Sequence, residues 1–169
     1  MRISEPIGLD RSDVDLQQGV LTIRQAKFGK SRLVPLHAST IKKLSEYARL
    51  RDRLLPNPVS PSFFVSDRGT RLGDRSVHKC FVILSRQVGL RGATDRYGPR
   101  LHDLRHGFVI KTLVKWYRSG VDVERRMPIL TTYLGHGHVA DTYWYISATP
   151  QLLRLATLRL EKSKRRPLS

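Results

Sequence analysis

Hydrophobic and polar positions alternate in two short stretches near the start of the chain. Residues 20–24 and 33–37 each place apolar side chains at every second position, a pattern typical of strands with one buried face. Gly19 precedes the first stretch, and the sequence FGK lies between the two. We therefore expect a small antiparallel sheet with a lysine-tipped hairpin. A further short strand is expected at FFVS, residues 63–66.

Apolar residues at helical spacing occupy most of the remaining chain. They predict helices over residues 39–54, 77–88, 102–118, 121–127, 128–134, 142–146 and 148–160. Pro128 is expected to begin one of these helices and Gly135 to end it. The first residues, around Pro6, are typical of the end of a helix, so we expect that a segment normally stands upstream.

These elements predict a mainly α fold with a small antiparallel β-sheet (α+β). The chain shows no internal repeat and no interior linker, so we expect one domain over residues 1–160 and a basic flexible tail over 161–169. At 169 residues and 40% hydrophobic content, the chain can bury one good core. It has no run of eighteen apolar residues and no apolar signal sequence, which predicts a cytoplasmic protein.

The single cysteine, Cys80, excludes an internal disulfide and a cysteine metal site. It shares helical spacing with Val77, Phe81 and Leu84, so we expect it to lie in the core.

The charge balance is the most informative feature of the composition. Lys and Arg number 31 against 14 Asp and Glu, which gives a formal charge of +17 and a pI of about 10.9. This excess is distributed along the chain and predicts a polyanionic partner, such as double-stranded DNA. No basic amphipathic helix has large apolar anchors to spare, so we expect no membrane binding.

Polar side chains cluster within the otherwise apolar helical segments between residues 101 and 145. The clusters are His102 with Arg105, His136 with His138, and Tyr143 with Tyr145. His102 and Arg105 share one helical face, where a buried cation is costly unless an anion receives it. A structural explanation is also open: Arg105 could pair with Asp103 or Glu124, while the histidines and tyrosines pack in the core.

The ordered segments RISEPIGL, AKFGKSRLVPL, HDLRH, YLGH and DTYWY resemble the conserved boxes of the tyrosine recombinase (phage integrase) catalytic domain. The resemblance covers nearly the whole chain, and the ordered set is specific where any one box would be weak. DTYWY is similar to the ending of integrases from prokaryotic mobile elements, which implies a nucleoid-associated protein. Family members carry a helical DNA-clamping domain and further helices before the first arginine. We therefore expect an N-terminally incomplete catalytic domain whose activity is impaired.

The resemblance implies site-specific DNA recombination or integration by strand cleavage and rejoining, and it assigns the site residue by residue. The implied catalytic residues are Arg2, Lys27, His102, Arg105, His136 and Tyr145. Glu5 would orient Arg2. Lys27 is preferred to Lys30 because the first lysine of the hairpin box usually aligns with the catalytic one. The side chains expected to bind DNA are Lys30, Arg32, Arg96 and Arg100.

These residue types suit attack on a phosphodiester. Arg2 and Arg105 would stabilise charge on the non-bridging oxygens, and His136 would donate a further hydrogen bond. Tyr145 would be the nucleophile, His102 a base or proton relay, and Lys27 the acid for the leaving 5′ oxygen. A covalent 3′-phosphotyrosine conserves the bond energy, so we expect no cofactor, whether metal or ATP.

Alternative functions and the quaternary structure stay open at this point. The chain could be a non-catalytic, DNA-binding remnant of an integrase, whose charge would be identical. HDLRH also resembles the HExxH zinc motif of metallopeptidases, although Asp103 replaces its glutamate and Arg105 would stand beside the metal. The helix over residues 148–160 could dock on a neighbouring protomer in a dimer or tetramer on DNA, or pack within its own chain.

Overall fold

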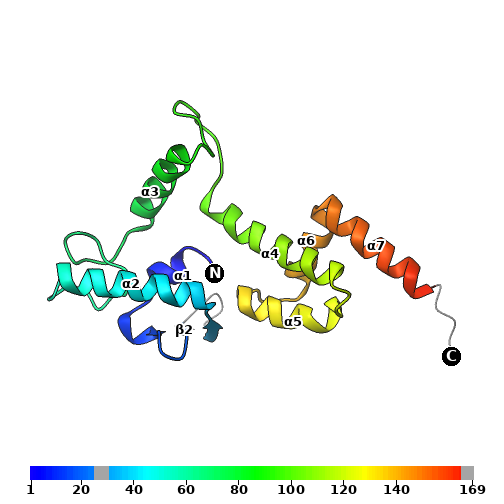
Figure 1. The fold of residues 1–169 in the computed structure, drawn as a ribbon, viewed down its shortest axis with the longest axis horizontal. Helices are drawn as coiled ribbons and strands as arrows, with labels where there is room; N and C mark the ends of the chain where they lie inside the picture. Colours follow the sequence, from blue (N-terminus) through cyan, green and yellow to red (C-terminus); the bar gives the residue numbers. More distant parts are fainter. Residues whose placement is uncertain (25–30, 165–169) are drawn as a thin grey trace. The chain divides into compact units, whose positions relative to one another are not determined.

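The computed structural model describes residues 1–24 and 31–164, with side chains to residue 161, and divides into two compact units (Figure 1). Unit 1 comprises residues 1–102 and unit 2 begins at Asp103. Unit 1 contains α1 (Ser4–Ile7), the 3-10 helix η1 (Arg11–Asp13), β1 (Val14–Asp15), β2 (Val20–Ile23), β3 (Arg32–Pro35), α2 (Ala38–Leu54) and α3 (Asp74–Gln87). Helix α4 (Leu101–Arg118) leads into unit 2, which continues with α5 (Val123–Leu134), α6 (Ala140–Ala148) and α7 (Pro150–Lys164). The predicted fold class, mainly α with a small antiparallel sheet, is confirmed.

The sheet of unit 1 has the strand order β1-β2-β3, and both pairs are antiparallel. Leu21 lies opposite Val34, and both are buried together with Ile23, whereas Leu33 is exposed. The alternation of the sequence therefore predicted the buried face correctly. The predicted lysines of the hairpin, Lys27 and Lys30, lie outside the described residues.

The predicted strand at residues 63–66 is wrong, because the backbone of this segment forms no strand ladder. Isolated bridges form at Ser62, directly before it, and at Val65 within it, but no strand is present there. The backbone N–H of Val65 donates to the Tyr47 hydroxyl of α2 at 3.0 Å. Phe63 and Phe64 pack their rings against Tyr47, with centroids 5.8 and 5.2 Å away. Aromatic packing on α2 thus takes the place of a strand ladder.

Cys80 is exposed, so its predicted place in the core is wrong. Along α3 only Ser85 is buried; Ile83 and Leu84 are exposed, and so is Val88 directly after the helix. Helical spacing determines which residues share a face, but another element must cover that face before its residues become core.

Helix α5 runs without interruption from Val123 to Leu134, although two helices separated at Pro128 were predicted. A proline inside a helix costs about 3 kcal/mol. The face of α5 that carries Val123, Met127 and Leu130 is buried, and each fully buried side chain of this kind contributes roughly 1.5–3 kcal/mol. The free energy gained by burying these side chains therefore exceeds the cost of a proline inside the helix.

The C-terminal helix differs from its prediction in extent and in burial. Helix α7 continues to Lys164, so the expected boundary at residue 160 falls inside a helix. Leu152 is fully buried, whereas Leu153 and Leu160 of the predicted apolar face are exposed. Among the described residues, no helix combines the length and the apolar character needed to span a membrane.

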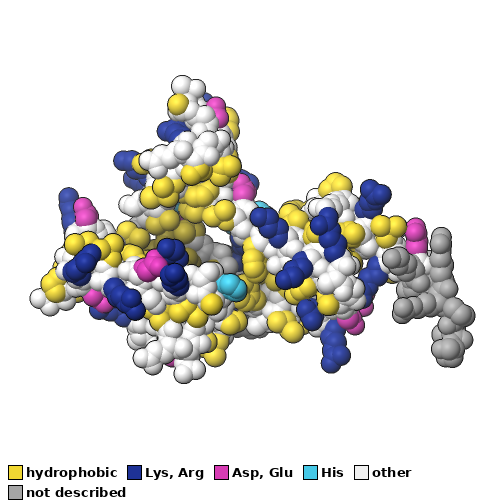
Figure 2. Space-filling model, in the orientation of Figure 1, with side chains coloured by type: hydrophobic (Ala, Val, Ile, Leu, Met, Phe, Trp, Pro, Cys, Tyr) yellow, Lys and Arg dark blue, Asp and Glu magenta, His cyan; other side chains and the backbone are white. Residues whose placement is uncertain are grey.

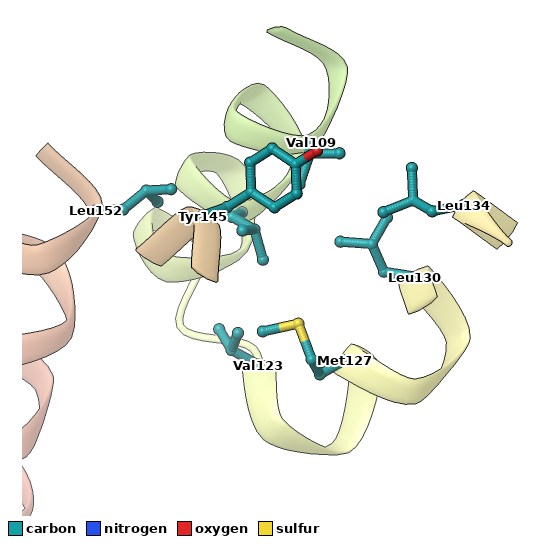
Figure 3. Close-up of a cluster of buried hydrophobic side chains, with 8 residues drawn as sticks. Val109, Val123, Met127, Leu130, Leu134, Tyr145 and Leu152 are labelled. Carbon is teal, nitrogen blue, oxygen red and sulfur yellow. The ribbon is translucent and has the colours of Figure 1, made fainter. Parts of the chain in front are cut away.

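The core of unit 2 is built from all of its helices. Figure 3 shows the ring of Tyr145 among side chains of the neighbouring helices. The cluster comprises Val109 and Leu113 of α4, Val123, Met127, Leu130 and Leu134 of α5, Tyr145 of α6 and Leu152 of α7. This packing fixes the ends of α4, α5 and α6 with respect to one another.

The N-terminal turn of unit 1 is tied to the sheet by a buried ion pair. Arg32 of β3 donates to both carboxylate oxygens of Glu5, at 3.1 and 2.9 Å, and the backbone N–H of Arg2 donates to the same carboxylate at 2.7 Å. Burial by itself raises the pKa of the Glu5 carboxyl. The hydrogen bonds from Arg32 and Arg2, with the charge of Arg32, outweigh burial and hold the pKa below its ordinary value.

Glu5→Gln should destabilise unit 1 by roughly 3 kcal/mol at neutral pH, because it leaves Arg32 buried without its counter-charge. The Glu5 pKa is lower in the folded chain than its ordinary 4.5, so the unfolded chain takes up this proton first on acidification. The stabilisation is therefore complete above pH 4.5 and is lost as the pH falls through the folded pKa. Urea unfolding followed by circular dichroism should show a shallower acid dependence for the variant.

Glu46→Gln is the matched control, because the Lys43–Glu46 pair is exposed and such pairs contribute about 0–1 kcal/mol. Equal losses in the two variants would contradict the role assigned to Glu5.

Candidate active site

The Arg105 side chain is buried and holds the end of another helix. Its residue is 7% exposed, and Nη2 donates to the backbone carbonyl of Leu134 at 2.8 Å. Leu134 is the last residue of α5, where carbonyl groups have no partner within the helix. The guanidinium of α4 thereby supplies a charged donor to the C-terminus of α5, a favourable position for a cation.

Gly135 then turns the chain so that His136 follows directly. Its φ of 72° and ψ of 38° lie in the left-handed region that glycine adopts without a Cβ clash. Gly135 N–H donates to Thr132 O at 3.0 Å, and His136 N–H donates to Thr131 O at 3.1 Å. This pair of bonds is a Schellman motif, and it fixes the backbone of His136 beside the carbonyl that Arg105 holds. The predicted end of the helix at Gly135 is confirmed.

A chain of hydroxyl groups connects the His136 ring to the core. His136 Nδ1 lies 2.8 Å from Thr142 Oγ1 on α6, and Thr142 Oγ1 lies 2.9 Å from Thr131 Oγ1 on α5. Thr131 Oγ1 donates to the carbonyl of Met127 at 2.9 Å. Thr142 and Thr131 are 0% and 6% exposed, so these bonds are shielded from water.

Tyr145 of α6 faces the interior of unit 2, whereas Tyr143 faces outward. Tyr145 is 4% exposed and Tyr143 is 41% exposed. The Tyr145 ring lies nearly parallel to the His136 ring, with centroids 6.3 Å apart, and 5.3 Å from the ring of His106 on α4. The packing role considered for the tyrosines therefore holds for Tyr145, but its neighbours are polar rings as well as aliphatic side chains.

The remaining predicted histidines are exposed. His102 lies in the first turn of α4, three residues before Arg105, and His138 follows α5. Arg96 and Arg100, predicted to contact DNA, are exposed in the segment before α4.

The other predicted residues belong to unit 1. Glu5 binds the backbone of Arg2 and the side chain of Arg32, so it fixes the chain at Arg2. Arg32, predicted to bind DNA, has this carboxylate as its partner, with only 9% of its side chain exposed. Its role in DNA binding stays a prediction, as do the roles of Arg2 and of Lys27 and Lys30.

The described residues do not support the alternative of a zinc site at HDLRH. Within residues 1–24 and 31–164, no group of three His, Cys, Asp or Glu side chains could hold a metal ion. His106, the second histidine of HDLRH, packs against the Tyr145 ring.

The structure adds His106, Thr131 and Thr142 to the site. His106 stands one turn after His102 in the sequence, a spacing that signals a shared face but not a contact with Tyr145. Thr142 begins the predicted segment 142–146, but its contact with His136 has no signal in the sequence. Thr131 carries no sequence signal, because its contact depends on the packing of α5 against α6.

Comparison with known proteins gives a consistent result. The chain matches the phage integrase family over residues 1–151. The y4rB protein of Sinorhizobium fredii, named as an integrase/recombinase, is 53% identical over 163 residues, which are 96% of this chain and 52% of that protein. More distant relatives are named tyrosine recombinases XerC, XerD and XerA. The chain spans about half the length of the curated relatives that it matches.

Solved structures share the fold. A XerA recombinase superposes with a TM-score of 0.70 at 26% identity, over 99% of this chain and 54% of that one. A XerH site-specific recombinase bound to its palindromic difH substrate gives a TM-score of 0.66 at 24% identity, over 95% of this chain and 42% of that one.

Arg105→Ala should lower the free energy of unfolding of unit 2 by roughly 2 kcal/mol, because a charged hydrogen bond to the buried end of α5 is lost. Trp116 and Trp144 both lie in unit 2, so their fluorescence during urea unfolding reports on this unit. Arg125→Ala on the exposed surface of α5 is the control and should change stability by less than about 0.5 kcal/mol. An Arg105 variant as stable as the control would show that the bond to Leu134 does not support the helix.

Proposed function

The chain belongs to the phage integrase family, and from this premise we propose that it acts in site-specific DNA recombination, breaking and rejoining strands through a 3′-phosphotyrosine. One observation carries the proposal: unit 2 places a buried arginine, a half-buried histidine and a tyrosine around the junction of α5 and α6. These are Arg105, His136 and Tyr145. All three stand in the family's ordered boxes.

In the proposed reaction, the Tyr145 hydroxyl oxygen attacks the phosphorus of a DNA phosphodiester. A bond from phosphorus to the tyrosine oxygen forms, the bond to the 5′ oxygen breaks, and that oxygen leaves as a hydroxyl with a proton. A second 5′ hydroxyl then reverses the step and releases Tyr145. Each step exchanges one phosphoester for another, so no nucleotide hydrolysis is required.

Arg105 and His136 would stabilise the charge that develops on the non-bridging oxygens. The Arg105 guanidinium is planar, and its bond to Leu134 fixes the direction of the whole donor fork. Donors that are already oriented cost no reorganisation during the reaction. His102, exposed on the same helix, is the proposed base or relay, and Arg2 and Lys27 keep their predicted catalytic roles.

The burial of Tyr145 constrains the reaction. Tyr145 is 4% exposed, and we expect α6 to shift when its hydroxyl meets a duplex phosphate. Thr149, between α6 and α7, has an extended backbone, so the two are separate helices. We therefore expect α6 to shift without a matching shift of α7. We include this shift of α6 in the proposal.

Charge supports DNA as the substrate. In Figure 2 the Lys and Arg side chains are spread over the visible face instead of gathering at one place, in agreement with a charge of +17 over the whole chain. The XerH recombinase of similar fold was solved with its palindromic difH substrate bound, and the Tn1549 transposon integrase was solved in complex with transposon right end DNA.

Self-association on DNA is a further part of the proposal. Leu153 and Leu160 of α7 are 50% and 62% exposed and stand seven residues apart, on one side of the helix, where they form an apolar surface that a second copy could cover. Sedimentation velocity with and without duplex DNA tests it, and a monomer under both conditions would contradict it.

The chain should bind duplex DNA with strong salt dependence, since each neutralised phosphate contributes about −0.9 to the slope of log K against log salt concentration. Fluorescence anisotropy on duplexes of unrelated sequence, at several salt concentrations, measures this slope. A slope near zero would contradict an electrostatic interface with DNA.

Tyr145→Phe should abolish the covalent adduct with DNA while the fold and DNA binding stay close to wild type, because only a hydroxyl is removed. The probe is a library of nicked duplexes with randomised sequence around the nick, from which cleavage traps an adduct that survives denaturing gels. Tyr143→Phe is the matched control, two positions away on the same helix, and should keep the adduct.

The outcomes separate the two candidate activities. An adduct that survives in Tyr145→Phe and disappears in Tyr143→Phe would assign the nucleophile to Tyr143. If wild-type protein binds the duplexes but traps none, the chain is a DNA-binding module without strand cleavage, and the proposed function is wrong.

A further inference from the structure

Three hydrogen bonds connect His136 to the core, and the bond to the carbonyl of Met127 determines the direction of the other two. The carbonyl of Met127 can only accept, so Thr131 spends its single hydroxyl proton on it. The bond between Thr131 and Thr142 must then use the proton of Thr142. With that proton committed, Thr142 can only accept from His136, so Nδ1 of the ring carries a proton.

We propose that Thr142, aligned by Thr131, is a positioning residue that holds His136 with Nδ1 as the donor into the core. This inference rests on the proposed function for the role of His136 in the reaction, whereas the hydrogen-bond geometry does not depend on that function. The two ring nitrogens are thereby given different roles. In the proposed function, Nε2 is the nitrogen assigned to the phosphate. In the neutral ring Nε2 can only accept a proton, and it donates only in the imidazolium form.

Two features show that this arrangement is more than ordinary packing of threonine. Thr131 and Thr142 come from different helices, and both are nearly inaccessible to solvent, so water cannot replace either partner. Thr132 bonds back to the carbonyl of Pro128 at 3.0 Å in the same way that Thr131 bonds to Met127, but it is exposed. Thr132 thus provides a control with the same local bond and no part in the hydroxyl chain from His136 to Met127.

The experiment measures the tautomer of His136 in the 169-residue chain by ¹⁵N NMR of the ring nitrogens, at a pH above the midpoint of its own titration. Wild type and Thr132→Val should show the Nδ1–H form, whereas a free imidazole side chain favours Nε2–H. Thr142→Val, which keeps the shape and removes the hydroxyl, should shift the ring toward Nε2–H. Thr142→Ser should restore the Nδ1–H form.

Thr131→Val provides a second test that leaves Thr142 in place. Once its acceptor is gone, the Thr142 hydroxyl is released to donate to His136, so the Nδ1–H form should decline here as well. An Nε2–H tautomer in wild type, or a tautomer unchanged by both valine substitutions, would overturn the inference.

Strand cleavage gives an independent readout on the same nicked duplex library. Thr142→Val should slow adduct formation by about 10- to 100-fold without weakening DNA binding, because the imidazolium loses the bond that orients its Nε2 donor, and Thr142→Ser should recover most of the rate. If wild-type protein forms no adduct, the proposed function fails while the tautomer measurement still decides the positioning role. If the tautomer changes as expected and the rate does not, His136 is oriented by Thr142 but its orientation does not matter for cleavage.

Discussion

One buried charged hydrogen bond, from Arg105 to the carbonyl of Leu134, sets the geometry of unit 2. It satisfies the end of α5 at the point where Gly135 turns the chain, so the residue that comes next is placed by the helix end itself. A lone arginine in an apolar core would be costly, and the helix terminus offers it an acceptor with partial negative charge. The same bond orients the guanidinium and positions His136, so a single contact serves both stability and the site.

The core and the site share residues, and this creates a conflict between packing and reactivity. Tyr145 contributes a large ring to the cluster that includes Val109 and Leu113, which stabilises the unit. As the proposed nucleophile, however, Tyr145 has to reach a phosphate in solvent. Residues at functional sites often pay this kind of stability cost, and a short helix bounded by an extended residue is well suited to be the part that moves.

Electrostatics does different work in unit 1. Hydrogen bonding to Arg51, opposed by burial, lowers the pKa of Asp52, while for Asp13 burial raises the pKa and the hydrogen bond from Arg24 brings it below the ordinary value. Each of these carboxylates, like Glu5 with Arg32, pairs with arginine, and such pairs leave the net charge of +17 unchanged. The arginines of this chain therefore fall into two groups. Some stabilise unit 1 through ion pairs, and exposed ones such as Arg96 stay available to a polyanion.

The sequence by itself determined the elements with strong local signals. Alternation located β2 and β3 and their buried residues, and Gly135 marked the end of α5, because backbone conformation and side-chain period are local properties. The ordered boxes indicated the family and pointed to Arg105, His136 and Tyr145. Tertiary structure alone decided which predicted faces are covered: Cys80 is exposed, α5 passes through Pro128, and residues 63–66 pack on Tyr47 instead of forming a strand. It also decided the contacts of Thr131 and His106, since burial and hydrogen-bond partners depend on residues that are distant in the chain and become neighbours only when the helices pack.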